Sequence, residues 1–136
     1  MFGYRIYTRD EIEQKVALSR EKQYPFYFTH NGIEFCVVWS PYFQQYANVQ
    51  HLEFYAMSRG AEAYTDTGYR SNFVAYFGEG GALKPAGDAE KNTERTRDDI
   101  FDLYRQLLDD AGAKKAPVQS TIFDFLNDGG CQCAIG

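Results

Sequence analysis

The sequence predicts an α+β domain in which helices pack on one face of an antiparallel sheet of four or five strands. Aromatic residues make up 17% of the 136 positions, and 19 of the 23 lie before residue 78. Aromatic side chains favour the half-buried surface of a sheet. An Asn-Gly pair separates two apolar runs in this half, which indicates a hairpin, and the later part of the chain has apolar residues at helical spacing.

We expect one domain over residues 1–128. It consists of an aromatic-rich sheet half (1–77) and a helical, acidic tail (88–128) packed on it, and a flexible C-terminal tail follows over 129–136. A glycine- and proline-rich run, Gly78–Gly87, separates the two halves. The length is that of a single domain with its own core.

The first helix has a clear start signal. Thr8 and Glu11 are spaced as a capping box, in which each side chain accepts a hydrogen bond from the other residue's backbone N–H. We therefore expect a short strand over Gly3–Tyr7 and a helix over Arg9–Lys22.

The hairpin is the strongest local signal. Asn31-Gly32 favours a two-residue type I′ turn, because both central positions of that turn need a positive φ. Such a turn fixes the register of the strands Tyr24–His30 and Ile33–Trp39. Pro25 cannot donate a ladder hydrogen bond, so we expect the first of these strands at an edge of the sheet.

Two further strands follow. Apolar and polar residues alternate over His51–Met57, which predicts a half-buried strand, and Asn72–Phe77 is the next candidate. The 14 residues Ser58–Ser71 between them are long for a hairpin loop, and long loops in compact domains are often functional.

The tail contains the second main helix. We expect it to begin with Thr96 as N-cap and to stop at Gly112, and we expect a short helix after Ser120. Its apolar residues recur at helical spacing: Ile100, Leu103, Tyr104, Leu107, Leu108 and Ala111.

Charge favours a protein partner. The net charge of −5 argues against a general nucleic-acid binder, and most of the acidic excess lies after residue 87. Asp98, Asp102 and Asp109 share one helix face, where they can contact a partner with a basic, nucleic-acid-binding groove. We expect no direct nucleic-acid binding.

We also expect a cytoplasmic protein. No apolar run is long enough for a membrane span, the N-terminal residues lack the apolar stretch of a signal peptide, and three cysteines do not suggest a disulfide framework. No motif points to a cofactor.

A ligand pocket is the first alternative. Gly68 favours a turn that presents Tyr69 and Arg70, and Arg70 can bind a carboxylate or phosphate with two hydrogen bonds. His51 and Glu53, two apart on a strand, can join them. The competing interpretation is a structural turn whose arginine pairs with a local acid.

A thiol or metal site is the second alternative. Cys131 and Cys133 are spaced to chelate a soft metal or to form a redox pair, with Cys36 as the remaining sulfur. The competing interpretation is a frayed tail with free thiols.

Part of the sequence resembles a pattern in small uncharacterised bacterial proteins that are encoded on plasmids and other mobile elements. The resemblance covers His51–Phe54 and the later stretch Thr-Asp-Thr-Gly-Tyr-Arg-Ser-Asn-Phe at residues 65–73. Those proteins carry a Thr-Glu-Thr-Gly-Tyr-Arg-Ser-His-Phe-like stretch before an acidic helix, and Asn72 stands where they often have His. The resemblance implies a mobile-element origin rather than a particular activity.

Together these observations predict a small accessory protein that acts by binding rather than by catalysis. In its most concrete form it modulates or inhibits a host nucleic-acid-processing complex, such as a defence complex. The ligand pocket and the thiol or metal site remain the alternatives.

Overall fold

The computed structural model describes residues 3–44, 49–75 and 84–115. These residues form a four-stranded antiparallel sheet and three helices, so the predicted α+β class is confirmed. None of the helices in these ranges is long and apolar enough to cross a lipid bilayer.

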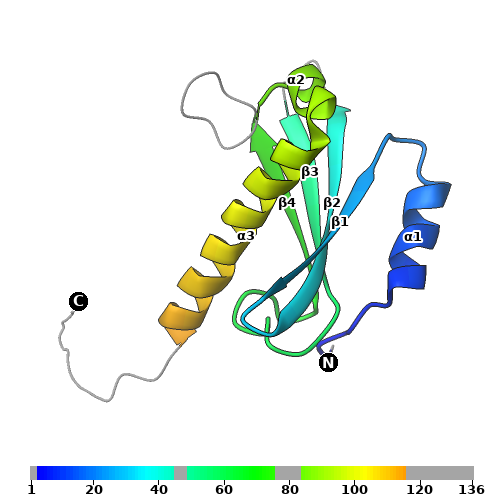
Figure 1. Ribbon diagram of the computed structural model, residues 1–136. Helices are drawn as coiled ribbons and strands as arrows, with labels where there is room; N and C mark the ends of the chain where they lie inside the picture. Colours follow the sequence, from blue (N-terminus) through cyan, green and yellow to red (C-terminus); the bar gives the residue numbers. More distant parts are fainter. Residues whose placement is uncertain (1–2, 45–48, 76–83, 116–136) are drawn as a thin grey trace.

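The strands follow one another across the sheet in chain order (Figure 1). They are β1 (Tyr24–His30), β2 (Ile33–Gln44), β3 (Val49–Ala56) and β4 (Tyr69–Ala75). This order leaves β1 and β4 at the two edges of the sheet, and the edge position of β1 is the one that Pro25 predicts.

The predicted hairpin and its register are confirmed. Asn31 and Gly32 both have positive φ, at 52° and 78°, which is the geometry of a type I′ turn. His30 pairs with Ile33 next to the turn, and the ladder continues without a shift to the pair of Tyr24 and Trp39.

The first helix, α1 (Arg9–Leu18), begins at the predicted capping box, in which Thr8 and Glu11 exchange hydrogen bonds. It ends four residues before the predicted Lys22. Residues 3–7 form no strand, although the Arg5 N–H donates to the Thr67 carbonyl at 2.9 Å. The N-terminal segment is therefore held against the loop that precedes β4.

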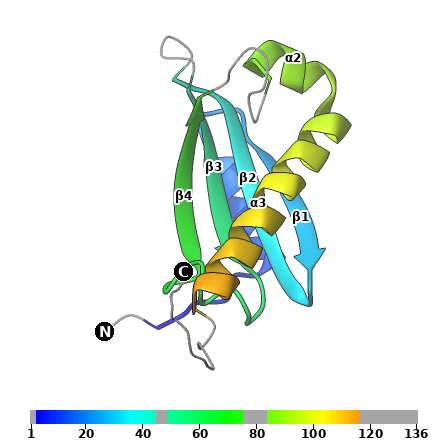
Figure 2. The same cartoon turned by 90° about the vertical axis from the view of Figure 1, so that its left-hand side faces the viewer.

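The helices lie on both faces of the sheet, which corrects the expectation of a single covered face (Figure 1). Helices α2 (Ala86–Lys91) and α3 (Thr93–Lys115) cover the larger core, and α3 runs obliquely across the strands (Figure 2). Helix α1 buries only Ile12, against Cys36, Val38 and Tyr55 on the opposite face. Because successive side chains of a strand alternate between faces, this second face also offers apolar positions.

The boundaries of α3 differ from the prediction. Asn92 rather than Thr96 caps the helix, since its Oδ1 accepts from the Arg95 N–H at 3.0 Å. Thr96 is buried, and its hydroxyl donates to the Ala89 carbonyl at 2.8 Å, which joins α2 to α3. The helix continues through Gly112, because a single glycine weakens a helix without ending it. The helix predicted after residue 120 lies outside the described residues.

Candidate functional site

Three of the four predicted ligand residues lie on the face of the sheet that carries α1. His51 and Glu53 point there from β3, and Tyr69 points there from β4. The Tyr69 hydroxyl donates to Glu53 Oε2 at 2.6 Å. Burial, together with the hydrogen bond to Glu53, raises the pKa of Tyr69, so this hydroxyl remains a protonated donor.

Arg70 lies on the opposite face, because it follows Tyr69 directly along β4. Its Nη1 donates to the Tyr64 carbonyl at 2.8 Å, and its guanidinium carbon lies 4.6 Å from the centre of the Tyr64 ring. The sheet therefore separates Arg70 from His51, Glu53 and Tyr69, and the four residues do not line one pocket.

In the turn before β4, two threonine hydroxyls bind the backbone of the turn itself. Thr65 Oγ1 donates to the Tyr69 carbonyl at 2.8 Å, and Thr67 Oγ1 donates to the same oxygen at 3.1 Å. These hydrogen bonds support the interpretation of this segment as a structural turn.

His51 belongs to a surface cluster of aromatic rings. Its Nε2 lies 2.6 Å from Ser71 Oγ, and its ring stacks on Phe73 with 4.7 Å between the ring centres. Phe43 lies 4.9 Å from the same imidazole, and Phe73 is 60% exposed. His51 therefore contacts Ser71 and two phenylalanine rings, whereas Glu53 accepts its hydrogen bond from Tyr69.

The predicted partner-binding aspartates are exposed on α3. Asp102 pairs with Arg105 at 3.0 Å, and Asp109 lies 2.9 Å from His30 Nε2 at the end of β1. Helix α3 contains six acidic and five basic residues. Its surface is therefore of mixed charge rather than uniformly acidic.

The predicted thiol site lies mainly outside the described residues, which include neither Cys131 nor Cys133. Cys36 is fully buried beneath α1, and burial raises the pKa of its thiol to about 12. Over residues 3–44, 49–75 and 84–115, no three His, Cys, Asp or Glu side chains are grouped to hold a metal ion.

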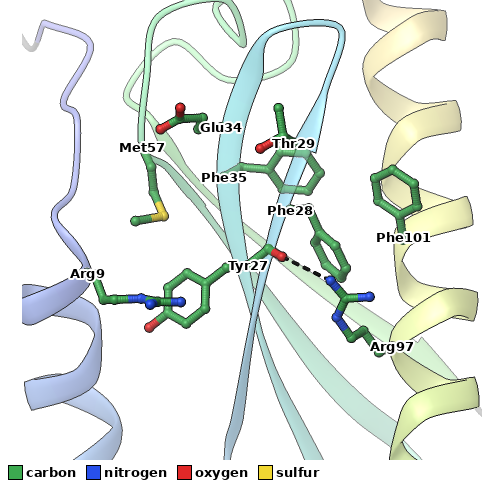
Figure 3. A pocket seen from close by; sticks show the side chains of 9 residues that line it. All are labelled: Arg9, Tyr27, Phe28, Thr29, Glu34, Phe35, Met57, Arg97 and Phe101. Carbon is green, nitrogen blue, oxygen red and sulfur yellow. Dashed lines mark hydrogen bonds between the residues drawn. The ribbon is translucent and has the colours of Figure 1, made fainter.

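A cleft of about 420 Å³ lies at the outer edge of β1, between α1 and α3 (Figure 3). Both faces of the sheet contribute to it, because it extends around the edge strand. The lining residues are Arg9, Tyr27, Phe28, Thr29, Glu34, Phe35, Met57, Arg97 and Phe101.

Within the described residues, no strand pairs with the outer edge of β1, and this edge faces the cleft. In a two-residue hairpin the residues that flank the turn form a hydrogen-bonded pair, so His30 and Phe28 pair with β2, while Tyr27 and Thr29 direct their N–H and C=O outward. The backbone of Pro25 faces outward like that of Tyr27 and Thr29, so the missing N–H of this proline removes no hydrogen bond between β1 and β2. In the described part of the chain, Arg97 Nη2 donates a long hydrogen bond, 3.4 Å, to the outward-facing Tyr27 carbonyl.

Two arginines from different helices border the edge. The Arg9 guanidinium carbon lies 3.8 Å from the centre of the Tyr27 ring, and that of Arg97 lies 5.1 Å from the centre of the Phe28 ring. Their ion pairs are long: Arg9 lies 4.0 Å from Glu13, and Arg97 lies 3.9 Å from Asp98. Among the described residues neither guanidinium has a short ion pair, so a carboxylate that enters the cleft can bind both.

Sequence reasoning identified the edge strand but not this cleft. Arg9 opens the first helix and Arg97 lies within the acidic tail, so their juxtaposition depends on the two helices covering opposite faces. Pro25 predicted the edge position of the strand that borders the cleft, but it did not predict the cleft.

Comparison with known proteins adds no relative. No protein-family model matches the chain, and neither the curated proteins nor the solved structures include a significant match. The resemblance to mobile-element proteins therefore remains a prediction.

Proposed function

We propose that this protein is a binding module that holds an extended segment of a partner protein along the open edge of β1. By occupying that segment it modulates or inhibits the partner. The observation that supports this proposal is the cleft around the edge strand, where outward-facing backbone groups lie between two arginines. Addition of a strand to a sheet edge is a common mode of peptide recognition, in which main-chain hydrogen bonds supply affinity.

Aromatic walls favour binding at this place. Phe28 and Phe101 lie with ring centres 5.1 Å apart on the α3 side, and Tyr27 lies on the α1 side. A peptide strand seated here would bury apolar side chains against these rings on both faces. The cleft thus combines backbone pairing, apolar contact and positive charge.

The acidic face of α3 is a second candidate surface. Asp98 and Asp102 side chains are 71% and 64% exposed, and they suit a partner with a basic groove. A host nucleic-acid-processing complex, as the charge pattern predicts, is a partner of that kind. The ion pair of Asp102 with Arg105 and the contact of Asp109 with His30 reduce the exposure of these carboxylates to a partner, so the edge of β1 is the better supported site.

Charged side chains at a sheet edge also prevent pairing with other chains. The competing interpretation is therefore that Arg9 and Arg97 keep the β1 edge from binding any strand. A displayed library of random eight-residue peptides, selected against the purified protein, separates the two roles. We expect selected peptides to bind the wild type and to lose at least about tenfold in affinity on the Arg9→Gln/Arg97→Gln variant.

A second pair of variants tests the backbone. Thr29→Pro removes an outward N–H without removing a ladder bond, and Thr29→Val keeps that N–H. Peptides should fail to bind Thr29→Pro and should bind Thr29→Val as they bind the wild type. Equal binding to all variants, or self-association of the arginine variant without any peptide binding, would contradict the proposal.

A further inference from the structure

The geometry points to a specific ligand for the β1 edge: an extended segment with two adjacent acidic residues, one directed to each face of the sheet. This inference rests on the proposed strand addition. It names the partner chemistry, which the proposed function leaves open.

The alternation of a docked strand sets the spacing. A residue that pairs opposite Tyr27 directs its side chain to the α1 face, where Arg9 lies, and the residue opposite Phe28 directs its side chain to the α3 face, where Arg97 lies. Neighbouring positions of the ligand therefore meet different arginines. This holds for a parallel and for an antiparallel ligand strand, because paired residues share a face in both.

Glu34 disfavours the alternating spacing. It pairs with Thr29 across the hairpin and lies on the α1 face of the same cleft, two residues nearer the turn than Tyr27. A ligand with acids at positions i and i+2 would direct both to one face and would reach only one of the two arginines; a second acid opposite Thr29 would also approach Glu34. Two strand spacings, roughly 10 Å, separate the ligand from β2, which is about one Debye length at physiological salt, so this repulsion is weak but unfavourable.

The arginines suit carboxylates in particular. Glu13 accepts a hydrogen bond from the Tyr27 hydroxyl at 2.9 Å and lies 4.0 Å from the Arg9 Nε. Arg97 has its own weak acceptor in the Tyr27 carbonyl at 3.4 Å. A ligand carboxylate would give each guanidinium a shorter, charge-assisted partner.

Two synthetic peptides of equal composition test the inference: acetyl-Thr-Val-Glu-Glu-Thr-Val-Thr-amide and acetyl-Thr-Glu-Val-Glu-Thr-Val-Thr-amide, each with a fluorophore. Fluorescence anisotropy measures their affinities for the full chain. The adjacent peptide should bind about fivefold more tightly than the alternating one. Glu34→Gln should reduce this difference by strengthening only the alternating peptide.

The outcomes separate this inference from the proposed function. Equal affinity of both peptides, with a loss for both on Arg9→Gln/Arg97→Gln, would overturn the spacing rule and leave strand addition intact. Absence of binding by either peptide, together with no selected library peptide, would overturn both. An affinity difference that Glu34→Gln does not change would contradict the role assigned to Glu34.

Discussion

Gly68 lies so close to Arg5 that a β-carbon at Gly68 would stand 2.0 Å from the Arg5 carbonyl oxygen. The contact sits where the N-terminal segment crosses the loop before β4, beside the hydrogen bond from the Arg5 N–H to the Thr67 carbonyl. Gly68 also has a φ of +88°, which residues with side chains rarely adopt. Space and backbone conformation both require glycine here.

Substitution of this glycine should be the most costly of three matched changes. We expect Gly68→Ala to lower the free energy of unfolding by about 3 kcal/mol, because it adds an atomic overlap to backbone strain. Gly32→Ala, with φ of +78° but open space around it, should cost about 1 kcal/mol. Gly87→Ala has neither constraint. Urea denaturation measures all three, and equal losses for the first two would contradict the close approach.

Glu90 should make stability depend on acid pH. Hydrogen bonds from Lys22, Tyr24 and Tyr42 lower the pKa of its carboxyl from the usual 4.5 to about 2. Its folded pKa lies below its unfolded pKa, so this contribution is present above pH 4.5 and is lost as the pH falls through 2. Glu90→Gln should cost about 1 kcal/mol near neutral pH, since Lys22 is 60% exposed and screened.

The control for Glu90 is Asp88→Asn, an exposed acid on the same helix. Thermal melts from pH 7 down to pH 2 should show a smaller loss of stability for Glu90→Gln than for the wild type, whereas Asp88→Asn should follow the wild type. If the stability of Glu90→Gln fell with decreasing pH as steeply as that of the wild type, the lowered pKa of Glu90 would not be the cause of the pH dependence.

Cys36 should be inert in the folded protein. Its side chain is fully buried and burial raises its thiol pKa to about 12, so thiolate is scarce at pH 8. The wild type and Cys36→Ala should give the same number of reactive thiols under native conditions. In denaturant the wild type should give one more, and a native difference between the two proteins would refute this burial.

The acidic face of α3 has its own test. Replacement of Asp98, Asp102 and Asp109 together by Asn should change stability by less than about 1 kcal/mol, because exposed charges contribute little. Peptides bound at the β1 edge should bind this triple variant as they bind the wild type. A loss of affinity with a flatter salt dependence would favour the acidic face as the partner site.

Local signals predicted the parts of this fold that short-range chemistry controls. Thr8 and Glu11 define the start of α1, and Asn31-Gly32 defines the hairpin and its register, because caps and tight turns depend on residues adjacent in the chain. The helix start at Asn92 was not predicted, because Asn92 and Thr96 are both suitable caps by sequence, and only the hydrogen bond from the Thr96 hydroxyl to the Ala89 carbonyl, formed between two helices, removes Thr96 from that role.

The sequence alone determined the α+β class, the hairpin and the position of β1 at an edge, since composition, turn chemistry and Pro25 are local properties. Only the tertiary structure decided which residues meet. The opposite faces of β4 separate Arg70 from Tyr69, whereas the placement of α1 and α3 on opposite faces brings Arg9 and Arg97 to one edge. Such juxtapositions depend on long-range packing of helices against the sheet, which no local pattern in the chain specifies.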